Sequence, residues 1–447
     1  MSFAANGKSA SPPAESFSEG PFGLSSDPAS LKQTVYSSAS TIISQTIYSL
    51  ASTIFSFESL GAENFVDGEL QLWAQQYRRP NAVGAVPPLH RLEPRTGAAH
   101  ALLGYARNGA PTTAVLGCQM RCRTMQPSFS KPSPRGPICL HVSAVDYDVE
   151  SSTYVSSYAG AVAAARAAGR PVVSAVDSRA SDLQHSTIFA HFLSAATRAP
   201  ALHVFDGPEF ARTFARFHGV MSVPALGRLY QQLLAVGSGA PASIDAAVDW
   251  AFATYNKEAG TNLQPFEYVG HASPETVFVV HGAHEAAQLK AVVKRAAQTA
   301  PVGVVTVRVP FPFSQARFTE VIPLTTKNVV VLSAEEGSAL KADAAAALFF
   351  AGRFSSVVVD EFIYPPNFVW SPITVLKVVT EFAPSVDHAV VLASERAPVG
   401  EITANTSPEG AFLVWAKDNS DVVHTAGKLA LSLSLDNSKE REYQKQV

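Results

Sequence analysis

The sequence of 447 residues contains only three cysteines, and only 16% of its residues are charged. Three cysteines cannot form the disulfide framework of a secreted domain, and an odd number is typical of a reducing compartment. The 34 lysines and arginines do not outnumber the 37 aspartates and glutamates, so the basic excess of a dedicated nucleic-acid-binding protein is absent. No apolar run reaches the roughly 20 residues that a membrane-spanning helix needs. We therefore expect neither nucleic acid nor a membrane as a partner.

The first 30 residues lack a periodic apolar pattern and are rich in Ser, Pro, Gly and Ala. Such a segment cannot bury enough apolar area to offset its ordering entropy, which predicts a disordered tail over 1–30. No apolar run follows Met1, and the first arginine is Arg78. A secretory signal and an Arg-rich mitochondrial presequence are therefore not expected, and a cytoplasmic location is predicted.

Short apolar runs alternate with longer helix-like runs over residues 31–262. The apolar runs are nearly continuous, as in strands that are covered on both faces, and the alternation predicts an α/β domain with a parallel sheet. The predicted strands are 112–116, 138–142, 171–176 and 201–205. The predicted helices are 35–54, 69–77, 151–168, 182–198, 208–217, 225–236 and 244–257. Ser243 and Gly260 suit the cap and the stop of the last helix.

The same alternation returns over residues 263–395 and predicts a second α/β domain. Its predicted strands are 276–280, 303–309, 328–332 and 356–359, and its predicted helices are 286–297, 340–350 and 374–382. The region 396–447 contains one strand-like run and a charged end, which predicts the start of a further domain or a linker.

Standard catalytic and metal-binding motifs are absent. There is no phosphate-binding loop, no G-x-G-x-x-G turn after a strand and no G-x-S-x-G elbow. The cysteines lack the second pair that a zinc site needs, so packing or loop positions are favoured for Cys118, Cys122 and Cys139 over a reactive thiol at Cys122, and His203 is expected to be a core residue. His185 and His191 are six residues apart and do not form a helical metal pair. No metal site is predicted.

Acidic residues follow two predicted strands, and an aromatic loop follows the second. Asp206 has a weak claim to be a site residue because ligands of open α/β sheets bind at the carboxyl ends of strands. Asp360-Glu361 occupies a comparable position. The segment 364–372 contains three prolines and three aromatic residues, and it either covers its own sheet or forms a docking surface through Tyr364, Phe368 and Trp370.

Five runs in a fixed order carry a family resemblance: 95–99, 203–207, 266–277, 307–313 and 363–372. Together they resemble the first two domains of the pyruvate:ferredoxin oxidoreductases and, more closely, the N-terminal half of the fungal NADPH sulfite reductase flavoprotein (alpha) components. The resemblance implies a thiamine-diphosphate-binding-like parallel-sheet domain followed by a transketolase-C-terminal-like α/β domain. It also implies homo- or hetero-oligomers.

The resemblance implies that the thiamine chemistry is lost. Active relatives carry a glutamate that bonds to the aminopyrimidine of the cofactor, and the matching position here is Arg95, whose guanidinium has no acceptor. Glu93 is the weak candidate for a replacement, two residues out of register. The relatives' loop for the substrate carboxylate falls near 55–59, where Glu58 would repel a 2-oxo acid.

Three functions follow from this resemblance. The first is a non-catalytic N-terminal scaffold of an assimilatory NADPH-dependent sulfite reductase, which serves cysteine and methionine synthesis. The segment would itself hold no cofactor, a separate C-terminal module would bind FAD and NADP, and the partner would be the hemoprotein (beta) component. The second is a thiamine-dependent 2-oxo acid oxidoreductase subunit that relies on Glu93. The third is a free-standing interaction module.

Overall fold

The computed structural model describes residues 34–387 with several gaps. The gaps are 58–66, 93–99, 105–112, most of 119–136, 149–152, 207–213, 335–337, 354–355, 366–367 and the single residues 77, 79, 83 and 101. The predicted tail 1–30 and the region 396–447 lie outside the described residues. No helix in the described ranges is long and apolar enough to cross a membrane.

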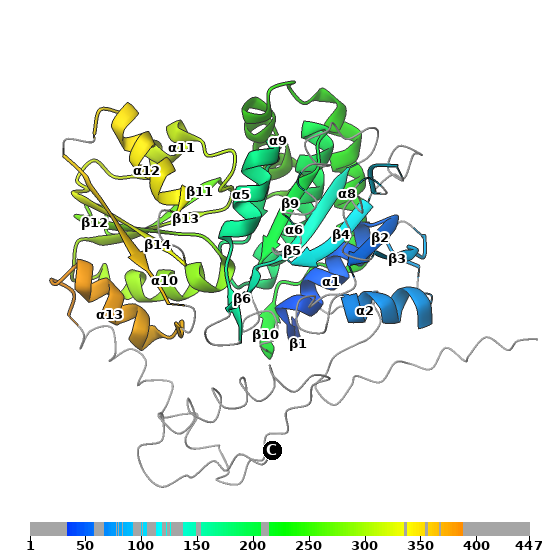
Figure 1. The fold of residues 1–447 in the computed structure, drawn as a ribbon, viewed down its shortest axis with the longest axis horizontal. Coiled ribbons are helices and arrows are strands. Elements are labelled where there is room, and N and C mark those ends of the chain that lie inside the picture. The colour runs from blue at the N-terminus through cyan, green and yellow to red at the C-terminus, as the bar shows by residue number, and fades with distance from the viewer. Residues whose placement is uncertain are drawn as a thin grey trace, which may run out of the picture.

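The first sheet has six parallel strands in the order β3-β2-β4-β5-β9-β8 (Figure 1). Its strands are β2 (Thr53–Phe57), β3 (Leu89–Leu92), β4 (Thr113–Cys118), β5 (Ile138–Ser143), β8 (Val172–Ser174) and β9 (Ala201–Phe205). Two antiparallel pairs accompany it. They are β1 (Thr34–Ser38) with β10 (Phe214–His218), and β6 (Val145–Asp148) with β7 (Thr153–Ser156).

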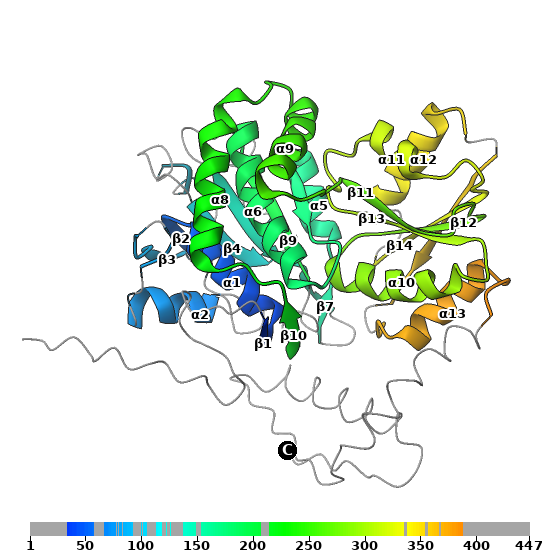
Figure 2. The same ribbon diagram turned by 180° about the vertical axis from the view of Figure 1, so that it is seen from behind.

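Helices cover both faces of this sheet, as the apolar runs predicted (Figure 2). One face packs against α5 (Ala159–Ala168) through Leu140 and Val142 of β5. The other face packs against α6 (Ala180–Thr197), with α1 (Ala39–Leu50), α8 (Val223–Val236) and α9 (Ile244–Ala259) around it. A short α2 (Asp67–Gln71) continues into a π-helix, Leu72–Gln76, and a 3₁₀ turn, Gly237–Gly239, follows α8.

The N-terminal helix is shorter than the apolar spacing predicts. The segment 35–54 is divided into β1, α1 and the start of β2, since its many β-branched residues favour strands at both ends. Every residue of α1 is buried although half of the helix is polar. Three of these buried hydroxyls have hydrogen-bond partners inside the helix. They donate to backbone carbonyls four residues earlier at 2.6–2.8 Å, from Ser44, Thr46 and Ser49.

The second sheet has five strands in the order β11-β13-β12-β14-β15, with only β11 antiparallel. Its strands are β11 (Phe266–Gly270), β12 (Thr276–Val280), β13 (Val302–Val307), β14 (Asn328–Ser333) and β15 (Val358–Ile363). On one face lie α10 (Ala283–Ala296) and α13 (Pro372–Phe382), and on the other α11 (Gln315–Val321) and α12 (Ala339–Phe350). Successive residues of β12 supply the two cores alternately, Val277 and Val279 to one and Phe278 and Val280 to the other.

Further predictions from the sequence were wrong in the described ranges. The predicted helix 208–217 ends in a strand, because β10 pairs with β1 across the sequence, and its residues 208–213 lie outside the described ranges. The predicted helix 151–168 begins with strand β7. Asp360 and Glu361 lie inside β15 and not after it, so they do not follow a strand end. The strands β3 and β11 and the helix α11 were not predicted.

Candidate functional site

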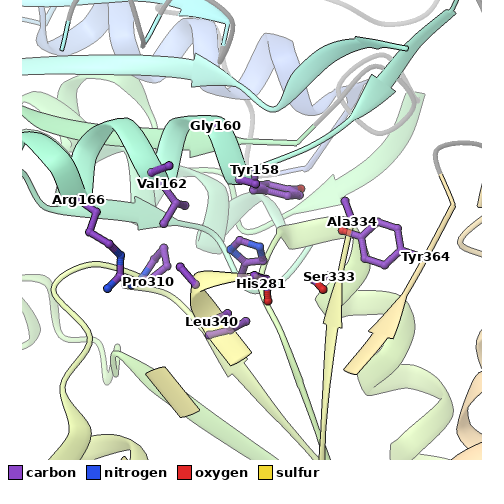
Figure 3. A pocket seen from close by; sticks show the side chains of 14 residues that line it. Tyr158, Gly160, Val162, Arg166, His281, Pro310, Ser333, Ala334, Leu340 and Tyr364 are labelled. Atoms are coloured by element: carbon purple, nitrogen blue, oxygen red, sulfur yellow. The ribbon is translucent and has the colours of Figure 1, made fainter. Parts of the chain in front are cut away.

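A cavity of about 300 Å³ lies between helix α5, which covers one face of the first sheet, and the second sheet (Figure 3). Tyr158 and Arg166 line it from the side of α5, and His281 and Ser333 line it from the second sheet. Tyr364 of the predicted aromatic loop also faces it. The cavity thus lies between side chains from distant parts of the sequence.

The topology of the second sheet places this cavity at a characteristic position. The chain passes from β12 to β13 on one side and then crosses to β14 on the other, so the strand order reverses between β12 and β14. His281 directly follows β12, and Ser333 ends β14. Ligands of open α/β sheets bind outside the carboxyl ends of strands at such a reversal. The cavity is therefore the best candidate site by position.

The polar groups of the cavity wall are largely used by the chain itself. Ser333 and Ser338 each donate a hydroxyl to Glu361 Oε1, at 2.7 and 2.8 Å, and Lys341 Nζ lies 3.4 Å from Glu361 Oε2. Burial alone would raise the pKa of Glu361, but these donors and the nearby charge lower it. The carboxylate already occupies the N-terminus of α12, where a bound anion would otherwise be favoured.

An aromatic pair closes one end of the cavity. The rings of Tyr158 and His281 lie 4.7 Å apart, and burial lowers the pKa of His281 to about 4. His281 is therefore neutral at physiological pH and offers one donor and one acceptor. Burial also raises the pKa of the Tyr158 phenol, as do the charges of Asp206 and Glu285, so it remains a hydroxyl.

Arg166 closes the other end by pairing with Asp343 of α12. Both terminal nitrogens of its guanidinium donate to the Asp343 carboxylate in a bidentate arrangement. The guanidinium also lies over the ring of Phe311, 5.2 Å from its centroid. This pair joins a helix of the first sheet to a helix of the second.

The strongest polar link between the two sheets begins at Asp206, directly after β9. Its carboxylate accepts the backbone N–H of Ala283 at 2.9 Å and that of His284 at 2.8 Å, which are the first residues of α10. The Tyr158 hydroxyl also donates to it. Gly282 allows this approach, because it has φ 94° and a Cβ there would lie 2.5 Å from the Tyr158 hydroxyl oxygen. Burial raises the pKa of Asp206, although its hydrogen bonds oppose this.

Arg308, which follows β13, forms a second link. Its guanidinium donates to Asp182 and Ser186 of α6 and to Glu267 of β11, each at 2.7 Å. Its side chain is only 1% exposed. Burial would raise the pKa of Asp182, but Arg308 and the backbone amide of Val176 lower it. Both terminal nitrogens of this buried cation are bonded to the chain, and only its Nε lacks a partner, so its role is structural.

The residues singled out from the sequence are placed differently. Glu93, Arg95 and Glu58 lie outside the described residues. Tyr364 and Trp370 are 4% and 8% exposed in the core of the second sheet, with Phe368 packed against them. Their positions agree with a loop that covers its own sheet.

Sequence reasoning missed Tyr158, His281 and Arg308. The last two directly follow or closely follow strands, and that position is the only sequence signal that could have found them. Their roles depend on how the two sheets pack together, which local patterns do not encode.

The comparisons with known proteins agree with this architecture. No protein-family model matches the chain. The sulfite reductase [NADPH] flavoprotein component of Saccharomyces cerevisiae is 29% identical over 428 residues, covering 95% of this chain and 38% of that protein. The chain resembles that flavoprotein component.

A putative pyruvate-flavodoxin oxidoreductase of Synechocystis sp. is 25% identical over 321 residues, which cover 64% of this chain and 26% of that protein. The chain thus spans about a quarter to two fifths of these two relatives. Among solved structures, the 2-oxoglutarate:ferredoxin oxidoreductase of Magnetococcus marinus matches with a TM-score of 0.52 and 12% identity, over 78% of this chain and 65% of that one. These similarities confirm the predicted fold class and place the chain among oxidoreductase-related proteins.

Thiamine diphosphate, which the fold family implies, does not fit the described residues at the carboxyl edge of the first sheet. The carboxylate there, Asp206, is fully engaged by α10 and Tyr158. No lysine or arginine directly follows β5, β8 or β9 within the described ranges.

Proposed function

We propose that this chain is the non-catalytic scaffold of an assimilatory NADPH-dependent sulfite reductase flavoprotein component. In the complete enzyme, electrons would pass from NADPH through FAD, in a module that these 447 residues do not include, to the hemoprotein component, which reduces sulfite to sulfide. The similarity to the yeast flavoprotein component over 95% of the chain supports this assignment.

The observation that carries the proposal is the use of the strand-end polar groups. In a catalytic α/β protein, the groups at the carboxyl ends of strands face a ligand. Here Asp206, after β9, binds the N-terminus of α10, and Ser333, at the end of β14, donates to Glu361, which itself accepts the first backbone N–H of α12's cap. Arg166–Asp343 and Lys290–Asp177 add ion pairs between the same two sheets. Within the described residues, Asp206, Arg166 and Lys290 bind across the two domains, and the Glu361 contacts are made inside the second.

The sequence provides a second argument for the same conclusion. Arg95 stands where active relatives have the glutamate that the cofactor needs, and a guanidinium cannot accept a hydrogen bond. A scaffold requires only that the packed core and the links between the sheets persist. These are the features that the described residues retain.

The proposal is tested by sedimentation velocity of the purified chain with the hemoprotein component from the same genome. We expect a joint boundary that is faster than either protein alone. The complete flavoprotein component serves as the positive control. If the complete component binds the hemoprotein while this chain sediments separately, the scaffold role is wrong, and the docking site belongs to the flavin module.

A further inference from the structure

Three imidazoles form a chain in the core of the first sheet. His141 of β5 and His203 of β9 are register partners on neighbouring strands, and their Nδ1 atoms lie 3.1 Å apart. On its other side, His141 Nε2 lies 2.9 Å from Nε2 of His191 in α6. All three side chains are at most 1% exposed. Apolar side chains of α6, α8 and α9 form the hydrophobic cluster beside these imidazoles.

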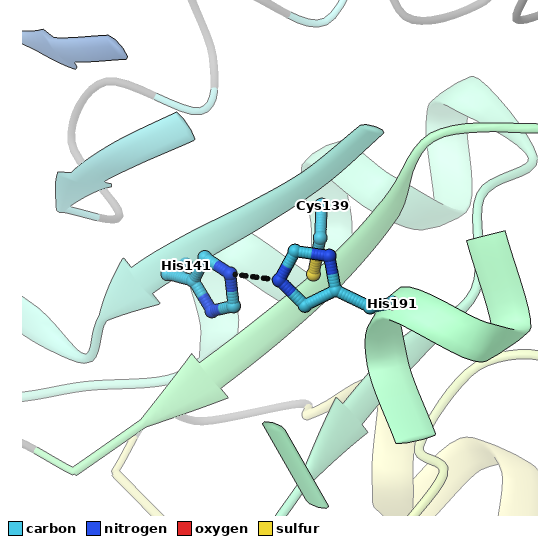
Figure 4. A group of neighbouring side chains, drawn as sticks. All are labelled: Cys139, His141 and His191. Atoms are coloured by element: carbon cyan, nitrogen blue, oxygen red, sulfur yellow. Dashed lines mark hydrogen bonds between the residues drawn. The ribbon is translucent and has the colours of Figure 1, made fainter. Parts of the chain in front are cut away.

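A thiol completes the group. Cys139 lies two residues before His141 on β5, so both side chains point to the same face of the sheet, toward α6. Cys139, His141 and His191 each offer one ligand atom, and these atoms all lie within 4.8 Å of one another (Figure 4). The sequence pattern did not reveal this group because His191 belongs to a helix some 50 residues later.

We propose that Cys139, His141 and His191 bind one Cu(I) ion as a three-coordinate site of one thiolate and two imidazoles. The donor set is soft and contains no oxygen, which excludes calcium and magnesium. Two nitrogens about 2.0 Å from a metal at 120° are about 3.5 Å apart, so the two Nε2 atoms would separate by less than about 1 Å.

The number of ligands distinguishes copper from zinc. Structural zinc sites have four protein ligands, and the described residues supply three ligands from Cys, His, Asp and Glu here. Thiolates and imidazoles suit Cu(I) as well as zinc, so the ligand types permit copper and the number of ligands favours it. A divalent ion with one thiolate would also leave a net positive charge in a fully buried site, at a high desolvation cost.

Binding of Cu(I) conserves the charge of the core. The S–H bond of Cys139 breaks, the Cu–S bond forms and the proton leaves to solvent, so one monovalent cation replaces another. The imidazoles are already neutral, because burial lowers the pKa of His191 to about 3 and also lowers that of His141. Burial raises the pKa of the free Cys139 thiol, so the thiolate forms only with the metal in place.

His203 is a positioning residue in this arrangement. When Nε2 of His141 binds the metal, Nδ1 of His141 carries the proton and donates it to Nδ1 of His203, which fixes the tautomer and the ring orientation. Nδ1 of His191 has no hydrogen-bond partner in the structure, so metal binding at its Nε2 would leave the same atom unpaired and no other.

The test is anaerobic refolding of the chain with Cu(I) under ascorbate, followed by challenge with bicinchoninate and metal analysis. We expect one copper per chain that resists the competitor, and an X-ray absorption spectrum with one sulfur and two nitrogen neighbours. Cys139→Ser should lose the copper, and His203→Gln should weaken binding by about 10–100-fold. Cys122→Ser, at a second buried thiol among the described residues, is the matched control and should bind as the wild type does.

Failure of the wild type to retain copper at one per chain would overturn the proposal, and so would equal retention by Cys139→Ser. Zinc bound in preference to Cu(I) under the same competition would also overturn it. If Cys139→Ser does not fold by circular dichroism, the absorption spectrum of the wild type decides, since a copper site without a sulfur neighbour contradicts the assignment.

Discussion

The carboxylate of Asp206, at the end of the first sheet, accepts the backbone N–H of Ala283, the first residue of α10 in the second domain, at 2.9 Å. A helix N-terminus favours a negative charge, and this one receives it from the other sheet. The contact therefore uses a group at a strand end to hold two α/β units together.

Removing this carboxylate should destabilise the chain. Asp206→Ala leaves two backbone N–H groups of α10 without their acceptor in a buried place, while the Tyr158 hydroxyl keeps Glu285 as an acceptor. We expect a loss of about 1–3 kcal/mol in the free energy of unfolding by urea. Asp245→Ala, in the exposed first turn of α9, is the control and should cost no more than about 1 kcal/mol. Equal losses would contradict the role of Asp206.

Arg308 should be more sensitive than any surface arginine. Arg308→Met leaves Asp182 buried without its cation and removes the link to Glu267, which predicts a loss of about 3–5 kcal/mol. Arg317, whose partners Asp249 and Glu320 are exposed, provides the matched control. Arg317→Met should cost at most about 1 kcal/mol. Urea denaturation of both variants measures the difference, and a small effect at Arg308 would show that the link is not needed.

The buried histidines predict that stability falls on mild acidification. Burial lowers the pKa of His191 and His203 to about 3, so the folded chain keeps them neutral, while the unfolded chain takes up protons near pH 6.5. The stability that these neutral imidazoles contribute is therefore fully present above about pH 6.5. It is lost as the pH falls toward 3, by up to about 1.4 kcal/mol per pH unit for each histidine.

Urea midpoints at pH 7.5 and 5.5 measure this loss. His203→Gln should reduce the difference between the two midpoints, and His218→Gln, at an exposed end of β10, should leave it intact. Identical midpoints for the wild type at both pH values would be incompatible with neutral buried imidazoles.

Asp182 predicts a separate transition at lower pH. Its pKa is lowered in the folded chain because Arg308 and the backbone amide of Val176 outweigh burial. The stability that this carboxylate contributes is present above its unfolded pKa of about 3.9 and is lost below it. Acid unfolding followed by circular dichroism should therefore steepen below about pH 4, and Arg308→Met should remove that steepening.

Much of the fold could be predicted from the sequence because its strands are apolar on both faces. The structure confirms 201–205 and 276–280 to the residue, as β9 and β12, and also the Ser243 cap and the Gly260 stop of α9. Strand β10 could not be predicted, since pairing with β1 overrides its local preference. The candidate site was harder to predict than the fold. Asp206 was noticed at a strand end, but its acceptance of the α10 amides depends on the packing of a distant domain.

The chain should not bind thiamine diphosphate. Isothermal titration with the cofactor and Mg²⁺ should give no binding heat, because the family resemblance puts Arg95 at the position of the required carboxylate and Asp206 is already bonded to α10. Micromolar affinity would instead favour the 2-oxo acid oxidoreductase. In that case Glu93→Gln should abolish pyruvate oxidation in a reconstituted complex.

The complete flavoprotein component with residues 31–387 deleted provides the most direct test of the scaffold role. Two rates are measured with the hemoprotein component present: NADPH-dependent reduction of cytochrome c, and NADPH-dependent reduction of sulfite. We predict that cytochrome c reduction per FAD is unchanged while sulfite reduction and co-sedimentation with the hemoprotein are lost. Loss of both rates together, or sulfite reduction at the intact rate, would contradict the account.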